Sequence, residues 1–281
     1  MQKKKNNWWH LLKQSVIEFK NDDGIKLSAS LSFYLIFSIA PLLIIIISIA
    51  DMFFGHEVVR RELFGQINRV VGSGTTIEVK DMIKSNKLSD HNTLATIIWA
   101  VLLFAGASGM FAEIHSTINY IWKIKAKRKD NATDFFKNRL KSISMLGSAV
   151  VLLVVGLIIN ELVDLLDGRM TTHFPNLNVH FFSALNALIV FSLITISFAI
   201  IFKTMPNKKV PVKGSLLGAL LSSVLFMIGK YVIEAYSGSP LASSTYGAAG
   251  SIVLLLIWIY YFSIILYLGA EFAKVHSDHL V

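Results

Sequence analysis

The sequence predicts an all-α integral membrane protein built as a bundle of six transmembrane helices. Apolar residues make up 54% of the 281-residue chain and charged residues only 16%, whereas soluble domains carry about 25% charged residues. Apolar stretches recur along the whole chain, so they are not one short, cleavable signal at the start. A helix needs roughly 20 mostly apolar residues to cross a bilayer, and several stretches reach that length.

Six segments meet this length requirement, and lipid restricts them to helices because unpaired backbone groups are costly in hydrocarbon. The second and sixth are longer than a bilayer requires, so we expect them to tilt or to project beyond it. Together the segments form one membrane domain over residues 1–281. The predicted spans are residues 31–54, 93–122, 143–163, 181–202, 214–235 and 247–273.

Two regions outside the spans have helical patterns of their own. In residues 1–30, apolar side chains recur at helical spacing among lysines, namely Trp8, Trp9, Leu11, Leu12, Val16, Ile17 and Phe19. This pattern predicts an amphipathic helix at the cytoplasmic membrane interface, and a helix packed beneath the bundle is an equal alternative. Residues 55–92 are predicted to form an external loop with short helices, because apolar residues recur there at helical spacing.

The distribution of the 27 lysines and arginines predicts the topology. Most of them lie before the first span, after the second, after the fourth and after the sixth. Cytoplasmic loops carry such an excess of basic residues. Both termini are therefore predicted to be cytoplasmic.

Three stretches together resemble a known family. Residues 28–47 read SASLSFYLIFSIAPLLIIII, residues 105–124 read AGASGMFAEIHSTINYIWKI, and residues 244–275 read STYGAAGSIVLLLIWIYYFSIILYLGAEFAKV. In this order they resemble the YihY/virulence factor BrkB family of bacterial inner-membrane proteins, over essentially the whole spanning region. The resemblance implies six spans, cytoplasmic termini and a place in the inner membrane. An older name of the family, ribonuclease BN, implies an RNA-cleaving enzyme.

Glu113 is the clearest candidate for function, because an ionisable group inside a span costs roughly 2.5–3.5 kcal/mol on insertion scales. Pro41 is expected at a similar depth, where its missing N–H frees a carbonyl and kinks the first span. We hypothesise a polar cavity between the two spans. In the alternative, Glu113 bonds the freed backbone or Asn119 and only stabilises the fold. The candidate lining residues are Tyr34, Pro41, Ser108, Gly109, Glu113, His115 and Asn119.

Four further residues are secondary candidates, each with a structural alternative. Lys230 and Glu234 are four residues apart near the external end of the fifth span, where they can pair. Glu271 is one turn before Lys274, which predicts an ion pair at the cytoplasmic end of the last span. Tyr246 belongs to the turn before that span and could line an opening, although turn chemistry alone explains the turn.

Signatures of catalysis are missing from the sequence. It has no phosphate-binding GxxxxGK[ST] loop, no HExxH and no GxSxG, and its eight histidines are dispersed. We expect no enzyme, no cofactor and no metal site. The lysines are explained by topology and by anionic lipid headgroups, so membrane lipids are the expected partners, without specific nucleic acid. No oligomeric state follows from the sequence.

Three functions remain, in order of preference. The first is a transporter or flippase-like protein for a lipid or another amphipathic or anionic solute. It is favoured by intramembrane acids, glycine-rich spans and a basic cytoplasmic rim. The second is a membrane scaffold or assembly partner that transports nothing. The third is a membrane-associated ribonuclease, which only the older family name supports.

Overall fold

The computed structural model of the protein describes residues 8–54, 64–65, 76–77, 80, 109–124, 179–237 and 250–279. Within its long helices, side chains are described for residues 8–39, 43, 187–233 and 253–279. The regular structure of these ranges is helical, without a strand, as the sequence predicts. The labelled helices are α1 (Trp8–Asn21), α2 (Gly24–Phe54), α6 (Val179–Thr204), α7 (Val212–Ser237) and α9 (Gly250–Asp278), and residues 109–121 form a further helical segment.

Three of these helices are long and apolar enough to cross a membrane. The qualifying segments are Ala187–Thr204 in α6, Val212–Ile233 in α7 and Val253–Asp278 in α9. They overlap the predicted fourth, fifth and sixth spans, with ends that differ by two to six residues. Helix α2 covers the predicted first span, and its described part Gly24–Ile39 is apolar. The predicted span 143–163, the first half of the span 93–122 and most of the loop 55–92 lie outside the described residues, so the count of six spans stays a prediction.

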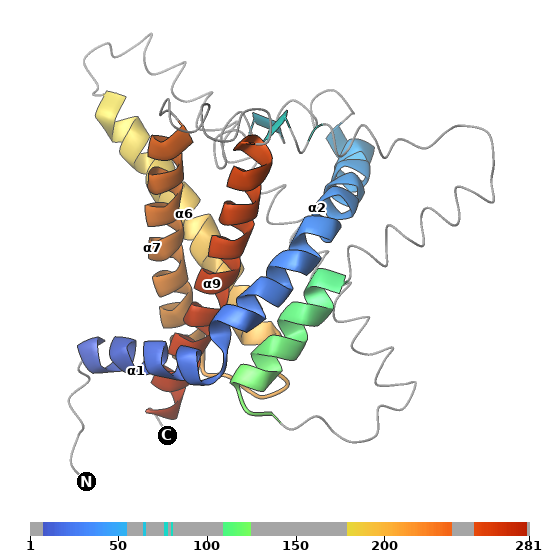
Figure 1. The fold of residues 1–281 in the computed structure, drawn as a ribbon. Helices are drawn as coiled ribbons and strands as arrows, with labels where there is room; N and C mark the ends of the chain where they lie inside the picture. Colours follow the sequence, from blue (N-terminus) through green and yellow to red (C-terminus); the bar gives the residue numbers. More distant parts are fainter. Residues whose placement is uncertain are drawn as a thin grey trace, which may run out of the picture.

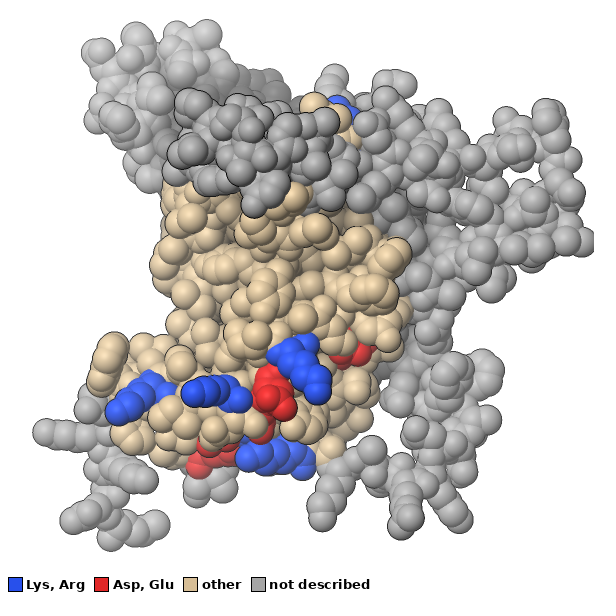
Figure 2. Space-filling view, in the orientation of Figure 1, with Lys and Arg blue, Asp and Glu red and all other residues tan. Residues whose placement is uncertain are grey.

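The sides of the bundle are apolar where they are exposed. Only 17% of the spanning window of α6 and 28% of that of α7 are buried inside the protein, and the remainder is rich in exposed apolar side chains such as Leu188, Val224 and Ile228. Figure 2 shows a wide surface without charge and a band of charged residues at one end of the bundle. An apolar surface of this extent fits contact with lipid rather than with water.

Helix α9 is the central element of the described bundle. It packs against α7, α2 and α1, while α6 packs against α7. Figure 1 shows α1 lying across the end of the bundle at which α2 and α7 begin and α9 ends. Aromatic rings fill the space between α6 and α9, where Phe198 stacks on Phe262 with ring centroids 5.9 Å apart.

The contact between α7 and α9 depends on small residues. A Cβ atom added at Gly218 would lie 2.5 Å from the Gly269 carbonyl oxygen, so the two backbones are nearly touching. Ser222 then donates a hydrogen bond of 3.1 Å to the Ile265 carbonyl. Small residues four positions apart allow this close approach of helices in lipid. They are Gly214, Gly218 and Ser222 on α7 and Gly269, Ala273 and Ser277 on α9.

Candidate functional site

A sharp corner joins α1 to α2 and brings the acidic end of α1 to the bundle. Asp23 has a φ of 55°, in the left-handed region that Asp adopts more readily than most side chains. Its N–H donates to the Lys20 carbonyl at 3.2 Å, which closes α1, and its own carbonyl accepts from Leu27 N–H at 3.0 Å. The last turn of α1 therefore faces the end of α9.

The helical segment 109–121 ends in a similar way. Lys123 has a φ of 51°, its N–H donates to the Tyr120 carbonyl at 2.8 Å, and Ile124 N–H donates to the Asn119 carbonyl at 3.0 Å. These two bonds form a Schellman motif with lysine in the position that glycine usually takes. The motif brings the Lys123 ammonium to 3.6 Å from Glu18 Oε2 of α1.

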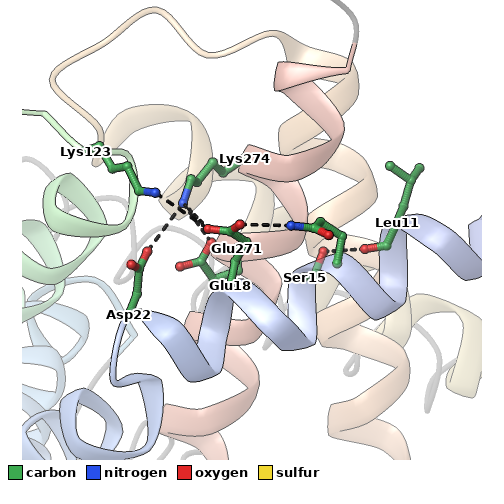
Figure 3. A network of polar contacts seen from close by, with 8 residues as sticks. Leu11, Ser15, Glu18, Asp22, Lys123, Glu271 and Lys274 are labelled. Carbon is green, nitrogen blue, oxygen red and sulfur yellow. Dashed lines mark hydrogen bonds and ion pairs between the residues drawn. The ribbon is translucent and has the colours of Figure 1, made fainter.

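Five charged residues meet at this point, and we call them the Lys274 cluster: Glu18, Asp22, Lys123, Glu271 and Lys274. Figure 3 shows them converging from α1, from its corner with α2, from the end of segment 109–124 and from α9. The Lys274 ammonium lies 3.2 Å from Glu271 Oε2, 3.4 Å from Asp22 Oδ2 and 3.7 Å from Glu18 Oε2. An ammonium has three N–H donors, so one is available for each carboxylate.

Most of the Lys274 cluster is withdrawn from water. The side chains of Glu271 and Lys274 are 1% and 8% exposed, whereas that of Lys123 is 65% exposed. Glu18 also accepts a 2.9 Å hydrogen bond from Gln14 Nε2. Buried charges are costly unless paired in good geometry, so the cluster fixes how α1 sits on α9.

The ion pair predicted between Glu271 and Lys274 is therefore confirmed. The sequence did not predict the other two partners of Lys274, which are Glu18 and Asp22. The only sequence signal for them is the i, i+4 spacing of two acids at the end of α1, whose sequence also contains lysines. That spacing says nothing about a residue some 250 positions away.

Apolar contacts join the same two helices. Leu11 of α1 packs with Phe272 and Val275 of α9, and the ring of Trp8 stacks on that of Phe272 at 6.4 Å between centroids. One face of α1 thus packs beneath the bundle, as one of the two alternatives from the sequence predicts.

Glu113 meets α2 at the level of Ser30. The Ser30 hydroxyl donates a 2.7 Å hydrogen bond to Glu113 Oε1, and one turn further along α2 the ring of Tyr34 lies against Gly109. From Ser30 to Tyr34 the chain of α2 advances by four residues, while the contacted residue of the other helix moves back by four, from Glu113 to Gly109. The two helices are therefore antiparallel. Pro41 is eleven residues beyond Ser30 on α2, about 16 Å along the axis. Glu113 does not share the depth of Pro41, in contrast to the prediction.

His115 and Asn119 face another neighbour. Asn119 Oδ1 accepts a 2.8 Å hydrogen bond from the backbone N–H of Asn207, and Asn207 Oδ1 lies 3.3 Å from His115 Nε2. Asn207 belongs to the connection between α6 and α7. At 100° per residue, His115 is about 160° round the helix from Glu113. The structure thus places the candidate residues in two groups on opposite faces of one segment.

The remaining candidates are placed less fully. Ser108 and Tyr246 lie outside the described residues. Helix α2 runs through Pro41, whose side chain is outside the described part. Lys230 is half-buried on α7, but the side chain of Glu234 is not among those described, so their pairing stays a prediction. Over the described ranges, no group of three or more histidines and acids is arranged to hold a metal ion.

Comparisons with known proteins match almost the whole chain. The profile of one family, described as virulence factor BrkB, matches residues 16–280. A UPF0761 membrane protein of Vibrio vulnificus (strain YJ016) is 28% identical over 257 residues, which cover 89% of this chain and 77% of the relative. One from Psychromonas ingrahamii is 27% identical over 264 residues, covering 92% and 85%. One from Saccharophagus degradans is 26% identical over 263 residues, covering 93% and 58%. No solved structure matches.

Proposed function

This chain belongs to the virulence factor BrkB family of membrane proteins, and on that premise we propose that it moves a lipid or another amphipathic or anionic solute across the bacterial inner membrane. The observation that carries the proposal is a contrast between two carboxylates, Glu271 of α9 and Glu113 of the second predicted span. Glu271 has a buried cation beside it. Glu113 is held by a neutral hydroxyl.

The contrast matters because a charge in the spanning layer costs roughly 2.5–3.5 kcal/mol and by default suggests a function. The Lys274 ammonium compensates Glu271 at 3.2 Å. None of the ion pairs in the described part of the chain includes Glu113, which accepts its hydrogen bond from Ser30. A carboxylate with one neutral donor can exchange that donor for the hydroxyl or ammonium group of a passing lipid headgroup.

Basic residues at the end of the bundle supply the complementary attraction for phosphate. Lys203, Lys208, Lys209 and Lys213 are exposed in and beside the connection between α6 and α7. Each lysine near an anionic surface contributes about 1 kcal/mol of attraction. The Lys208 ammonium lies 6.0 Å over the ring of Trp122, in the same segment as Glu113.

The two features are close enough to serve one molecule. Trp122 is nine residues beyond Glu113, about 14 Å along a helix axis. The connection between α6 and α7, which carries these lysines, lies at the same end of the bundle as α1 (Figure 1). We propose that this end, with both termini, faces the cytoplasm, since cytoplasmic loops carry the excess of lysine.

The test is transport by the full-length protein in liposomes. The probe is fluorescent NBD-phosphatidylglycerol, and dithionite in the outer medium reports how much probe reaches the outer leaflet. We expect Glu113→Gln to insert and fold normally and to move the probe at least about tenfold more slowly, because it removes the charge and keeps the shape. Ser30→Ala should change the rate too.

Ser197→Ala is the matched control, because the Ser197 hydroxyl bonds only the Leu193 carbonyl of its own helix in the described contacts. It should leave the rate unchanged. A wild-type protein that is folded and moves no more probe than empty liposomes would count against transport and in favour of a scaffold. A Glu113→Gln variant as active as wild type would leave transport standing and remove Glu113 from the mechanism.

A further inference from the structure

Helix α1 has a second apolar face that the bundle does not cover. Its first face, with Leu11, Ser15 and Phe19, is buried. Trp9 and Val16 are 75% and 55% exposed. At 100° per residue these two side chains project within about 20° of each other and about 100° round the helix from Ser15. They form one exposed line along α1.

We infer that this exposed face of α1 docks on the anionic surface of the lipid bilayer, with Trp9 and Val16 at headgroup depth. Figure 1 shows α1 lying across the direction of the spanning helices, so its length runs parallel to the membrane plane. An amphipathic helix in this orientation buries its apolar side at the boundary between headgroups and acyl chains. Tryptophan is enriched at that boundary.

The charges beside this face are complementary to anionic lipid. Lys13 and Lys20 are both exposed, and they lie about 40° and 20° round the helix from Trp9. Glu18, the acid of α1, lies about 180° from Trp9 and is held in the Lys274 cluster. The exposed face therefore combines apolar and basic side chains without an acid, which is the pattern of helices that bind anionic membrane surfaces.

The Lys274 cluster determines which way this face points. Glu18 Oε2 lies 3.6 Å from the Lys123 ammonium and 3.7 Å from that of Lys274, so two cations from neighbouring elements hold this one side of α1 and oppose its rotation about its own axis. These residues position the face and do not contact the lipid themselves. The docking of α1 does not depend on transport by the protein, so the two proposals are tested separately.

The chain contains no cysteine, so single cysteines can carry a spin label in the full-length protein. The protein is placed in nanodiscs of phosphatidylcholine, with or without phosphatidylglycerol, and collisions of the label with oxygen and with a water-soluble nickel chelate are measured. With phosphatidylglycerol present, we expect labels at Trp9→Cys and Val16→Cys to collide more often with oxygen than with the nickel chelate. A label at Asn21→Cys, on the exposed side of α1 that faces away from the bilayer, should collide more often with the nickel chelate than with oxygen. A label at the buried position Ser15→Cys should collide with neither reagent.

Charge recognition is tested by replacing lysines. Lys13→Gln together with Lys20→Gln should shift the Val16 label towards water in discs with phosphatidylglycerol and leave it unchanged in phosphatidylcholine alone. The matched control, Lys209→Gln with Lys213→Gln, should not shift it.

Three results would overturn the inference. A Val16 label as open to nickel as the Asn21 label would place this face in water. A Val16 label that meets neither reagent would show that protein covers it, either a second copy or a partner. A label that behaves alike in both lipid compositions, with and without the lysines, would remove the anionic surface as the partner.

Discussion

Replacement of Lys274 by methionine keeps an unbranched apolar stem and removes the ammonium that three carboxylates share. In the ion pairs of the described residues, Glu18 would then keep the exposed Lys123, whereas Glu271 and Asp22 would keep no cation. Removal of one partner from a buried ion pair costs about 3–5 kcal/mol, because the other charge stays buried without compensation. We expect a loss of stability in this range for Lys274→Met.

The same substitution at Lys123 is the internal control. Its side chain is 65% exposed and makes one contact of 3.6 Å in the cluster, and exposed pairs contribute about 0–1 kcal/mol. The two variants should differ by about 3 kcal/mol, which is a factor of roughly 100 in the unfolding equilibrium constant. Both change lysine to methionine in one cluster, so the comparison measures the combined effect of burial and of the number of carboxylates that each ammonium contacts.

The assay is reversible unfolding of the full-length protein in mixed micelles of increasing dodecyl sulfate content, followed by tryptophan fluorescence. Glu271→Gln serves as a third variant, since it removes one of the three negative charges and leaves an oxygen that can accept from Lys274. The Glu271→Gln variant should unfold at a higher dodecyl sulfate content than Lys274→Met. Equal midpoints for Lys274→Met and Lys123→Met would show that burial of the cluster does not determine its contribution, and the reasoning would then be wrong.

Three further predictions follow from the packing, the charge pattern and the missing motifs. Gly218→Ala should lower stability by about 1–3 kcal/mol through overpacking, because its Cβ would lie 2.5 Å from a backbone oxygen. Gly109→Ala, whose Cβ would have its nearest contact at 3.4 Å, should be neutral in the same unfolding assay. Reporter fusions after Lys209 and Val281 should report the cytoplasm and a fusion near Arg169 the opposite side; an external C-terminus would contradict the topology. Purified protein with Mg²⁺, Mn²⁺ or Zn²⁺ should cleave RNA no faster than a mock preparation, and cleavage that one acidic substitution abolishes would restore the ribonuclease alternative.

Part of the packing could have been predicted from the chain alone. The contact of α7 with α9 follows small residues spaced by four on both helices, at Gly214, Gly218, Gly269 and Ala273. This spacing is visible in the sequence and is a known route to close helix packing in lipid. The pairing of the two helices is nevertheless a tertiary fact, since each stripe could have met another small surface.

The sequence by itself determined what depends on neighbours along the chain. The positions of α6, α7 and α9 follow from the length of apolar stretches, and the Glu271–Lys274 pair follows from one helical turn. Only the tertiary structure joined Lys274 to Asp22, 252 residues away, and set Glu113 against Ser30 rather than level with Pro41. The physical reason is that the length of an apolar stretch determines which residues form a spanning helix. The packing of whole helix faces determines the depth and the rotation of that helix relative to its neighbours.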